Sequence, residues 1–256
     1  MNAAVEVQAV RVGAPGRGTT TSGIARLDDM LGGGFRTESM HAVCGPSFSG
    51  RSVLGLSFVL AGVRRGVPAI IVLTDCAPEE ARERMRALEP RFDDHERAGL
   101  VRFVDAYSRG IGRASVERNV ASVASACDLD GIAQAVERIQ DELGPERGQR
   151  LLVLSLSTIL ACAGARDTFC FLRSLTGRAR AGGATGLFVL GPGLHAPSEL
   201  ELLLHALDGA LELREAPDGH VLRVRGGSPA HRGWVEYAFS DEGFEVTGSF
   251  GTGRIR

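Results

Sequence analysis

Short apolar runs alternate with longer amphipathic segments along most of the chain. The apolar runs are strand-sized and predict buried strands at Ser39–Cys44, Ala69–Thr74, Val101–Asp105, Arg150–Ser155 and Gly186–Leu190. The segments between them predict helices at Ser52–Arg65, Ala77–Leu88, Asp128–Leu143 and Arg166–Ala181. Strands that are apolar on both faces and joined by helices predict a parallel sheet covered on both sides, as in an α/β domain of three layers.

The alternation of apolar runs and amphipathic segments ends after Leu207. Shorter strands are predicted from here on, separated by turns, at Ala210–Arg214, Val221–Arg225 and Trp234–Phe239. This pattern is typical of an antiparallel meander, which would extend the same sheet. We therefore expect one domain over residues 22–248, preceded by a flexible segment at 1–21 that is rich in Gly and Thr over Gly13–Thr21, and followed by a tail at 249–256.

Charge, apolar run length and cysteine pattern argue against several functional classes. A net charge of -2 over 256 residues gives no general argument for nucleic-acid binding. The longest apolar runs are too short to cross a bilayer, so no membrane association is expected. The five cysteines include no Cys-x-x-Cys pair, which favours reduced thiols, a cytoplasmic location and no zinc site. All 29 Lys and Arg residues are arginine, a bias that we attribute to a GC-rich genome.

One segment carries recognisable chemistry. Residues 45–52 read Gly-Pro-Ser-Phe-Ser-Gly-Arg-Ser, a phosphate-loop pattern that lies between a predicted strand and a predicted helix. Glycines let such a loop approach a polyphosphate, and the amides at the start of the helix point at it. The sequence therefore predicts nucleotide contacts from Gly45, Pro46, Ser47, Phe48, Ser49, Gly50, Arg51 and Ser52. Arginine replaces the usual lysine at Arg51, and its larger planar fork needs a different geometry, so we expect a weakened or altered contact.

Several segments, in order, resemble the KaiC-like branch of the RecA/RadA superfamily of P-loop ATPases. They are residues 21–35 with their Gly-Gly-Gly turn, 71–80, 101–107, 207–213, 222–229 and 239–244. The resemblance implies a RecA-like three-layer domain, with a mostly parallel central sheet extended by antiparallel C-terminal strands. It also implies ATP with Mg²⁺ as ligand, bound between subunits of a homo-oligomer or of a hetero-oligomer with a related ATPase. A protein partner is expected.

The resemblance also implies roles for single residues, and three positions depart from the pattern. Ser52 stands where the family offers Mg²⁺ a hydroxyl, but Arg51 replaces the lysine. The metal-organising aspartate of the fourth strand falls at Leu154, which offers no oxygen; Ser155 supplies a hydroxyl if the register moves by one. The acidic pair that activates water reads Asp75-Cys76, which leaves Asp75 as the candidate catalytic base, with a carboxylate one methylene shorter.

Two arginines on a late predicted strand match a different part of the family's site. A Lys-x-Arg pair at this position in the family reaches the nucleotide of the neighbouring subunit. Arg223 and Arg225 keep both charges, and the alternation of a strand directs them to one face. They are predicted to contact nucleotide, against the alternative of an exposed basic strand. Arg82, Arg84 and Arg86 are predicted to form a solvated helix face.

These observations lead to one hypothesis and two alternatives. The three departures affect positioning and charge neutralisation, on which phosphoryl transfer depends. We therefore expect a regulatory or scaffolding module with a degenerate ATP site, weak ATP binding, an incomplete Mg²⁺ site and little or no hydrolysis. The first alternative is an active ATPase in which Arg51 replaces lysine and Asp75 is the base. The second is an accessory protein of DNA recombination, which the charge of the chain does not support.

Overall fold

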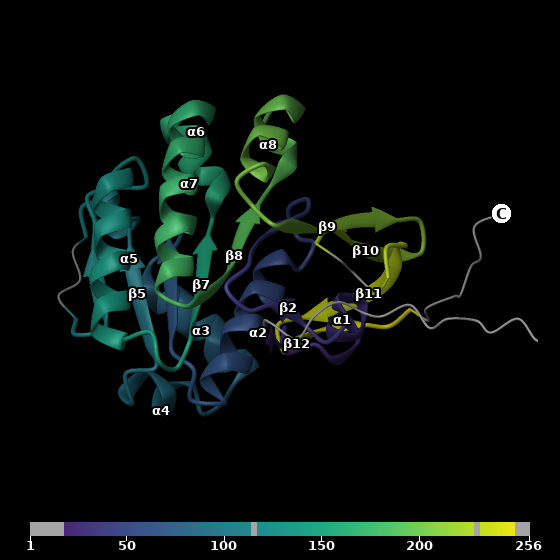
Figure 1. Ribbon diagram of the computed structural model, residues 1–256, viewed down its shortest axis with the longest axis horizontal. Coiled ribbons are helices and arrows are strands. Elements are labelled where there is room, and N and C mark those ends of the chain that lie inside the picture. Colours follow the sequence, from purple (N-terminus) through teal and green to yellow (C-terminus); the bar gives the residue numbers. More distant parts are fainter. Residues whose placement is uncertain (1–17, 114–116, 228–230, 249–256) are drawn as a thin grey trace, which may run out of the picture.

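A ten-stranded sheet forms the centre of the protein in the computed structural model, which describes residues 18–113, 117–227 and 231–248 (Figure 1). The strands lie in the order β12-β11-β10-β9-β3-β8-β7-β4-β5-β6. Those of the parallel part are β3 (Met40–Cys44), β4 (Ala69–Leu73), β5 (Val101–Asp105), β6 (Val120–Ser122), β7 (Gln149–Leu154) and β8 (Ala184–Leu190). The parallel pairs within this part are β3–β8, β8–β7, β7–β4, β4–β5 and β5–β6.

The C-terminal strands continue the sheet in antiparallel order. They are β9 (Gly209–Ala216), β10 (Gly219–Gly226), β11 (Val235–Ser240) and β12 (Gly243–Val246). Strand β9 joins the two parts, because it runs parallel to β3 and antiparallel to β10. The fold predicted from the sequence, a mostly parallel sheet extended by an antiparallel meander, is confirmed.

Helices cover both faces of the sheet and complete three layers (Figure 1). One face packs against α1 (Ala25–Leu31), α2 (Arg51–Val63), α3 (Pro78–Leu88) and α4 (Phe92–Arg97). The other packs against α5 (Leu129–Leu143), α6 (Leu156–Ala163), α7 (Ala165–Ala181) and α8 (Pro197–Leu204). The apolar stripe predicted on the third helix is buried, because Ile132, Val136 and Ile139 all lie in the second core. Short 3-10 turns follow β5 (η1, Ser108–Ile111) and β8 (η2, Pro192–Leu194).

The N-terminal part departs from the prediction. Strand β1 (Thr19–Thr20) pairs with β2 (Phe35–Arg36), so two residues of the segment predicted to be flexible are held in a small sheet. Residues 1–17 of that segment and the predicted tail at 249–256 lie outside the described residues.

The helix face that carries Arg82 also differs from the prediction. Arg82 is buried, and its guanidinium binds both carboxylate oxygens of Glu96 and also Glu117. Arg84 is exposed and pairs with Glu80. Arg86 is half-buried and pairs with Glu79 and Asp93. The predicted solvated face is therefore wrong at Arg82, which ties α3 to α4.

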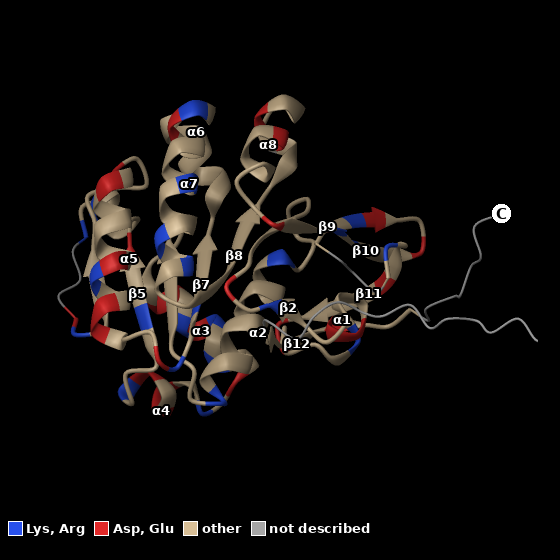
Figure 2. Ribbon diagram, in the orientation of Figure 1, with Lys and Arg blue, Asp and Glu red and all other residues tan. Residues whose placement is uncertain are grey.

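Figure 2 shows acidic and basic segments interspersed on helices such as α3 and α5. Over the part of the chain that the structure describes, no helix combines the length and apolarity needed to cross a bilayer.

Candidate nucleotide-binding site

The loop from Gly45 to Gly50 connects β3 to α2, and packing fixes its glycines. Gly50 has a φ of 75°, in the left-handed region that favours glycine. A Cβ at Gly50 would lie 2.5 Å from the ring of Phe239 on β11. A Cβ at Gly45 would lie 2.6 Å from the hydroxyl of Ser49 and 2.9 Å from Leu213 on β9. Both glycines are therefore required by the close approach of the C-terminal strands.

Hydrogen bonds hold the same loop to the antiparallel part of the sheet. The Ser49 hydroxyl donates to the Pro46 carbonyl at 2.8 Å. The Tyr237 hydroxyl donates to the Ser49 carbonyl at 2.7 Å, and Tyr237 stacks on Phe244 with ring centroids 4.6 Å apart. The loop is thus fixed in position by strands that lie far from it in the sequence.

The fixed loop leaves backbone donors unused. Within the described residues, the amides of Ser47, Phe48, Ser49 and Gly50 donate to no protein acceptor. Together with the first amides of α2, they form the kind of concave donor set that binds anions. Ser52 lies half-buried in the first turn of α2, beside these donors. The loop therefore has backbone donors without a protein acceptor at the position where a P-loop domain binds phosphate.

Phe48 was predicted to contact nucleotide with the rest of the loop, but its conformation and exposure were not predicted. Its φ is 63°, a conformation that residues other than glycine seldom adopt, and its side chain is 93% exposed. A large apolar side chain at the tip of a fixed loop costs solvation free energy unless something covers it. The signal available in the sequence was a phenylalanine between two serines in a loop of small residues.

Arg51 bends back onto its own loop. Its Nη1 donates to the Gly45 carbonyl at 2.5 Å, and the guanidinium lies against Gly191 after β8, where a Cβ would approach Nη1 to 2.7 Å. Burial lowers the pKa of Arg51, an effect that the negative charge of Asp75 opposes. Within the described ranges, no carboxylate forms an ion pair with Arg51, and the charge of Asp75 acts on it without direct contact. To reach a phosphate, however, the guanidinium must leave the Gly45 carbonyl.

Asp75 lies at the carboxyl edge of the sheet, after β4. Its side chain is exposed, yet the surrounding protein desolvates the carboxylate enough to raise its pKa, against the opposing charges of Arg84 and Arg51. Its neighbour Cys76 is buried, and that burial raises the pKa of the thiol to about 12. Asp75 is thus an acidic group near Arg51, and the position next to it carries no charge at neutral pH.

Leu154 ends β7 at the same edge, directly opposite Leu73 of β4, and only 4% of it is exposed. The next residue, Ser155, is buried; its Oγ accepts from the Ser157 amide at 3.2 Å, and its own amide donates to the Thr74 hydroxyl. No set of three His, Cys, Asp or Glu residues that would hold a metal ion occurs within residues 18–113, 117–227 and 231–248. Ser52 therefore offers a hydroxyl to Mg²⁺, but the residue at the end of β7 offers no oxygen, and the protein does not fit the ion at this position.

Arg223 and Arg225 lie on β10 and share one acceptor. Arg223 Nε donates to Glu212 Oε2 at 2.6 Å, and Arg225 Nη1 donates to Glu212 Oε1 at 2.8 Å. Glu212 lies on β9, where it is the parallel partner of Cys44 at the end of β3. Both arginines predicted to contact nucleotide are therefore hydrogen-bonded to one carboxylate of their own subunit, which offsets one of their two positive charges.

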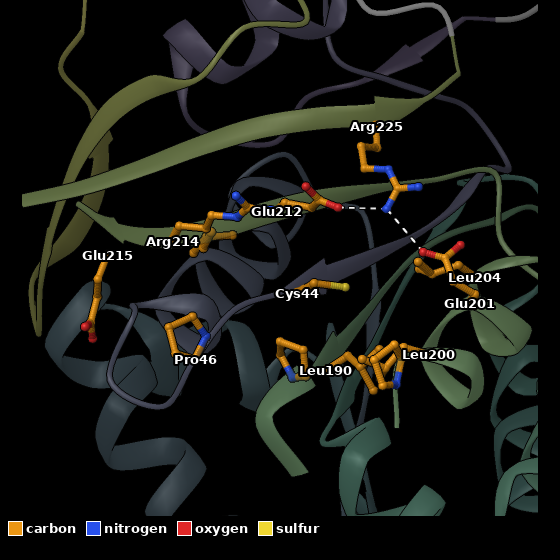
Figure 3. A pocket seen from close by; sticks show the side chains of 13 residues that line it. Cys44, Pro46, Leu190, Leu200, Glu201, Leu204, Glu212, Arg214, Glu215 and Arg225 are labelled. Atoms are coloured by element: carbon orange, nitrogen blue, oxygen red, sulfur yellow. Dashed lines mark hydrogen bonds and ion pairs between the residues drawn. The ribbon is translucent and has the colours of Figure 1, made fainter. Parts of the chain in front are cut away.

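A cavity of about 440 Å³ opens beside the loop, on the side of α8 and β9 (Figure 3). Its apolar wall comes from Pro46, Leu190, Leu200, Leu204 and Leu213. Figure 3 shows Arg225 on its rim, between Glu212 and Glu201. The half-buried Cys44 also lines the cavity, and burial raises the pKa of its thiol to about 12, so that the thiol stays protonated.

A glycine-bounded loop between a central parallel strand and a helix, on a sheet of this order, defines a P-loop domain of the RecA type. A family model described as "ATPase: KaiC" matches residues 20–225. The chain belongs to this family of KaiC-type ATPases, as the resemblance of its segments predicted.

The relatives are distant. A "UPF0273 protein" of Aeropyrum pernix is 27% identical over 217 residues, 79% of this chain and 80% of that protein. UPF0273 protein MK0039 of Methanopyrus kandleri is 30% identical over 47% of this chain and 49% of that protein. The "Circadian clock oscillator protein KaiC" of Thermostichus vulcanus is 24% identical over 90% of this chain. The match spans 42% of that KaiC, so this chain corresponds to less than half of its length.

A solved structure supports the same fold. The KaiC-like protein PH0186 of Pyrococcus horikoshii aligns with a TM-score of 0.72 over 91% of this chain and 100% of that one. Only 18% of the residues are identical, so the similarity concerns the fold.

Proposed function

We propose that this KaiC-family protein is a regulatory or scaffolding module that binds ATP weakly and hydrolyses it slowly or not at all. The observation that carries the proposal is Leu154, a buried leucine at the end of β7, where the family resemblance requires a metal-organising carboxylate. An aliphatic side chain supplies no oxygen to a metal ion or to its water shell. The cradle of amides favours an anion, while the site lacks the means to align a metal with it.

Arg51 supports the same proposal through geometry. The guanidinium hydrogen-bonds to the loop that should hold the phosphates, and that bond must break before Arg51 can contact ATP. Phosphoryl transfer depends on positioning and on neutralising charge on the transferred group, and a shift of about 1 Å can cost roughly a hundredfold in rate. Weak binding without efficient turnover follows.

One observation favours the alternative of an active ATPase. Asp75 is exposed near Arg51, and its pKa is raised from its ordinary value because the protein desolvates the carboxylate. A carboxylate with a raised pKa is a better proton acceptor. The alternative therefore assigns phosphate contact to Arg51 and activation of water to Asp75. The mixed surface charge gives no comparable support to a role in DNA recombination.

The test is a titration with labelled ATP, with and without Mg²⁺, on protein whose mass in solution has been measured. The mass matters because we propose that copies of this chain, or this chain and a related ATPase, assemble around the nucleotide. We expect weak binding that Mg²⁺ improves little, and phosphate release no faster than that of Ser52→Ala. In Arg51→Lys, the smaller ammonium is expected to improve ATP binding, by roughly tenfold (about 1.4 kcal/mol), without restoring turnover.

A different result would support the alternative. Phosphate release well above that of Ser52→Ala, lowered to the control level by Asp75→Asn, would show a working enzyme. No binding of any nucleotide by either the wild type or Arg51→Lys would instead leave a scaffold without a ligand.

A further inference from the structure

Glu212 occupies an unusual place between the phosphate loop and the arginine pair. It lies on β9 between the buried residues Leu211 and Leu213, and β10 sets Arg223 directly opposite it. Its two oxygens accept from different arginines, Oε2 from Arg223 and Oε1 from Arg225. One carboxylate thus satisfies both members of the pair.

The three side chains form a partly buried ionic group. The Glu212 side chain is 16% exposed, against 32% for Arg223 and 45% for Arg225. Burial alone would raise the pKa of Glu212, but hydrogen bonds from Arg225 and Arg223 outweigh it and hold the pKa below its ordinary value. The bond to Glu212 also raises the pKa of Arg225. Charge-assisted bonds of this kind are about twice as strong as neutral ones.

The surroundings hold this arrangement in place. Arg223 lies over the ring of Trp234, 4.6 Å from its centroid, and Arg214 lies 4.5 Å from the same centroid. Arg225 also approaches Glu201 of α8, at 3.5 Å, but that carboxylate is 60% exposed. Glu212 is therefore the principal partner of the pair, and Glu201 a peripheral one.

We propose that Glu212 is a built-in anion that closes the Arg223–Arg225 site from within, so that a polyphosphate must displace it to be bound there. The inference rests on the proposed function only in naming polyphosphate as the competing anion. A carboxylate joined to the fold has a higher effective concentration at the arginines than a dissolved anion. The pair is thus closed until Glu212 moves away or loses its charge.

The experiment measures binding of inorganic tripolyphosphate by calorimetry at low salt. Glu212→Gln removes the charge and keeps the shape, and is expected to bind tripolyphosphate roughly tenfold more tightly than the wild type, about 1.4 kcal/mol. The matched control, Glu201→Gln, removes a carboxylate that touches Arg225 alone and is expected to change the affinity less than about twofold. Adding Arg223→Gln and Arg225→Gln to Glu212→Gln is expected to abolish the gain.

The phosphate loop is common to all these variants, so the differences between them report on the arginine pair. Equal affinities of the wild type and Glu212→Gln would overturn the inference, as would a gain that persists without the two arginines. The proposed function fails on a different measurement, rapid phosphate release by the wild type. The two failures are therefore distinguishable.

A second measurement needs no variant that might fold poorly. Phenylglyoxal modifies accessible guanidinium groups, and mass spectrometry of peptides identifies the modified arginines. In the wild type, tripolyphosphate is expected to leave the modification of Arg223 and Arg225 unchanged, because Glu212 already occupies them. Protection of both arginines by tripolyphosphate would contradict a closed site.

Discussion

The loop after β3 and the edge formed by the ends of β4 and β7 are two halves of one site, and they differ in what holds them. In the loop, Gly45 and Gly50 are fixed by Leu213 and Phe239, and the Ser49 carbonyl by Tyr237. At the other edge, Leu154 is part of the core, while Asp75 is exposed. The first half keeps the loop of a P-loop domain, whereas the second has a leucine where the family resemblance implies a carboxylate.

The difference shows that a phosphate-loop pattern is evidence for a fold but not, by itself, for catalysis. Its glycines are needed here by the packing of the protein itself, whether or not a nucleotide binds. Carboxylates that would hold a metal have no such second role, because an isolated buried charge destabilises a fold. The presence of the loop is therefore weak support for catalysis, and the residues at the ends of β4 and β7 are decisive.

The largest effect is expected at the end of β7. Leu154→Asp places a carboxylate among apolar neighbours such as Leu73 and Leu152, and should lower the free energy of unfolding by roughly 3–5 kcal/mol. Urea denaturation measures the change, and Leu154→Met, which keeps the volume, should cost less than about 1.5 kcal/mol. A Leu154→Asp protein as stable as the wild type, and stabilised further by Mg²⁺, would reveal a metal site and remove the contrast between the halves.

A smaller effect is expected in the loop. Gly50→Ala forces a Cβ into the Phe239 ring and into a left-handed conformation, and should cost roughly 2–4 kcal/mol. Gly112 is the matched control, since its φ of 74° is nearly the same and a Cβ there would meet nothing within 4 Å. Gly112→Ala should cost only about 1 kcal/mol in thermal unfolding. Equal losses at the two glycines would mean that packing on Phe239 does not fix the loop.

The smallest effect is expected at Asp75. Because its side chain is exposed and no ion pair of the described residues involves it, Asp75→Asn should change the free energy of unfolding by less than about 0.5 kcal/mol. Chemical denaturation compares this change with that of Thr74→Val. The Thr74 hydroxyl donates to the carbonyl of Ser155 and accepts from its amide, so Thr74→Val removes two hydrogen bonds. Thr74→Val should destabilise the protein more. The reverse order would assign the structural role to Asp75.

Much of the fold was predictable because the parallel strands are short, fully apolar and separated by amphipathic helices. Each predicted strand agrees with an observed one to within about two residues. Helix α6 escaped prediction because it starts two residues after the end of β7, so that only Ser155 separates the strand from the helix and no loop marks the boundary. Strand β6, three residues long and half-buried, carries too little pattern to be noticed.

The sequence proposed which residues form the site, but it could not give their contacts. The loop pattern located Gly45–Ser52, and the family resemblance pointed to Leu154 and Asp75. That Arg51 binds the Gly45 carbonyl depends on a side-chain conformation, which a pattern does not contain. That Glu212 binds Arg223 and Arg225 depends on the register of β9 and β10. The only hint was an acidic residue within an apolar strand, opposite an Arg-x-Arg strand.

The outermost strands of the large sheet have a consequence for assembly. The sheet terminates in β6, with 3 residues, and β12, with 4. Such short edge strands offer few unpaired N–H and C=O groups to a strand of another molecule. This disfavours association by pairing of sheet edges. In the described part of the chain, side chains and loops rather than long strand edges are open to another copy, and a single substitution can change the charge of such surfaces.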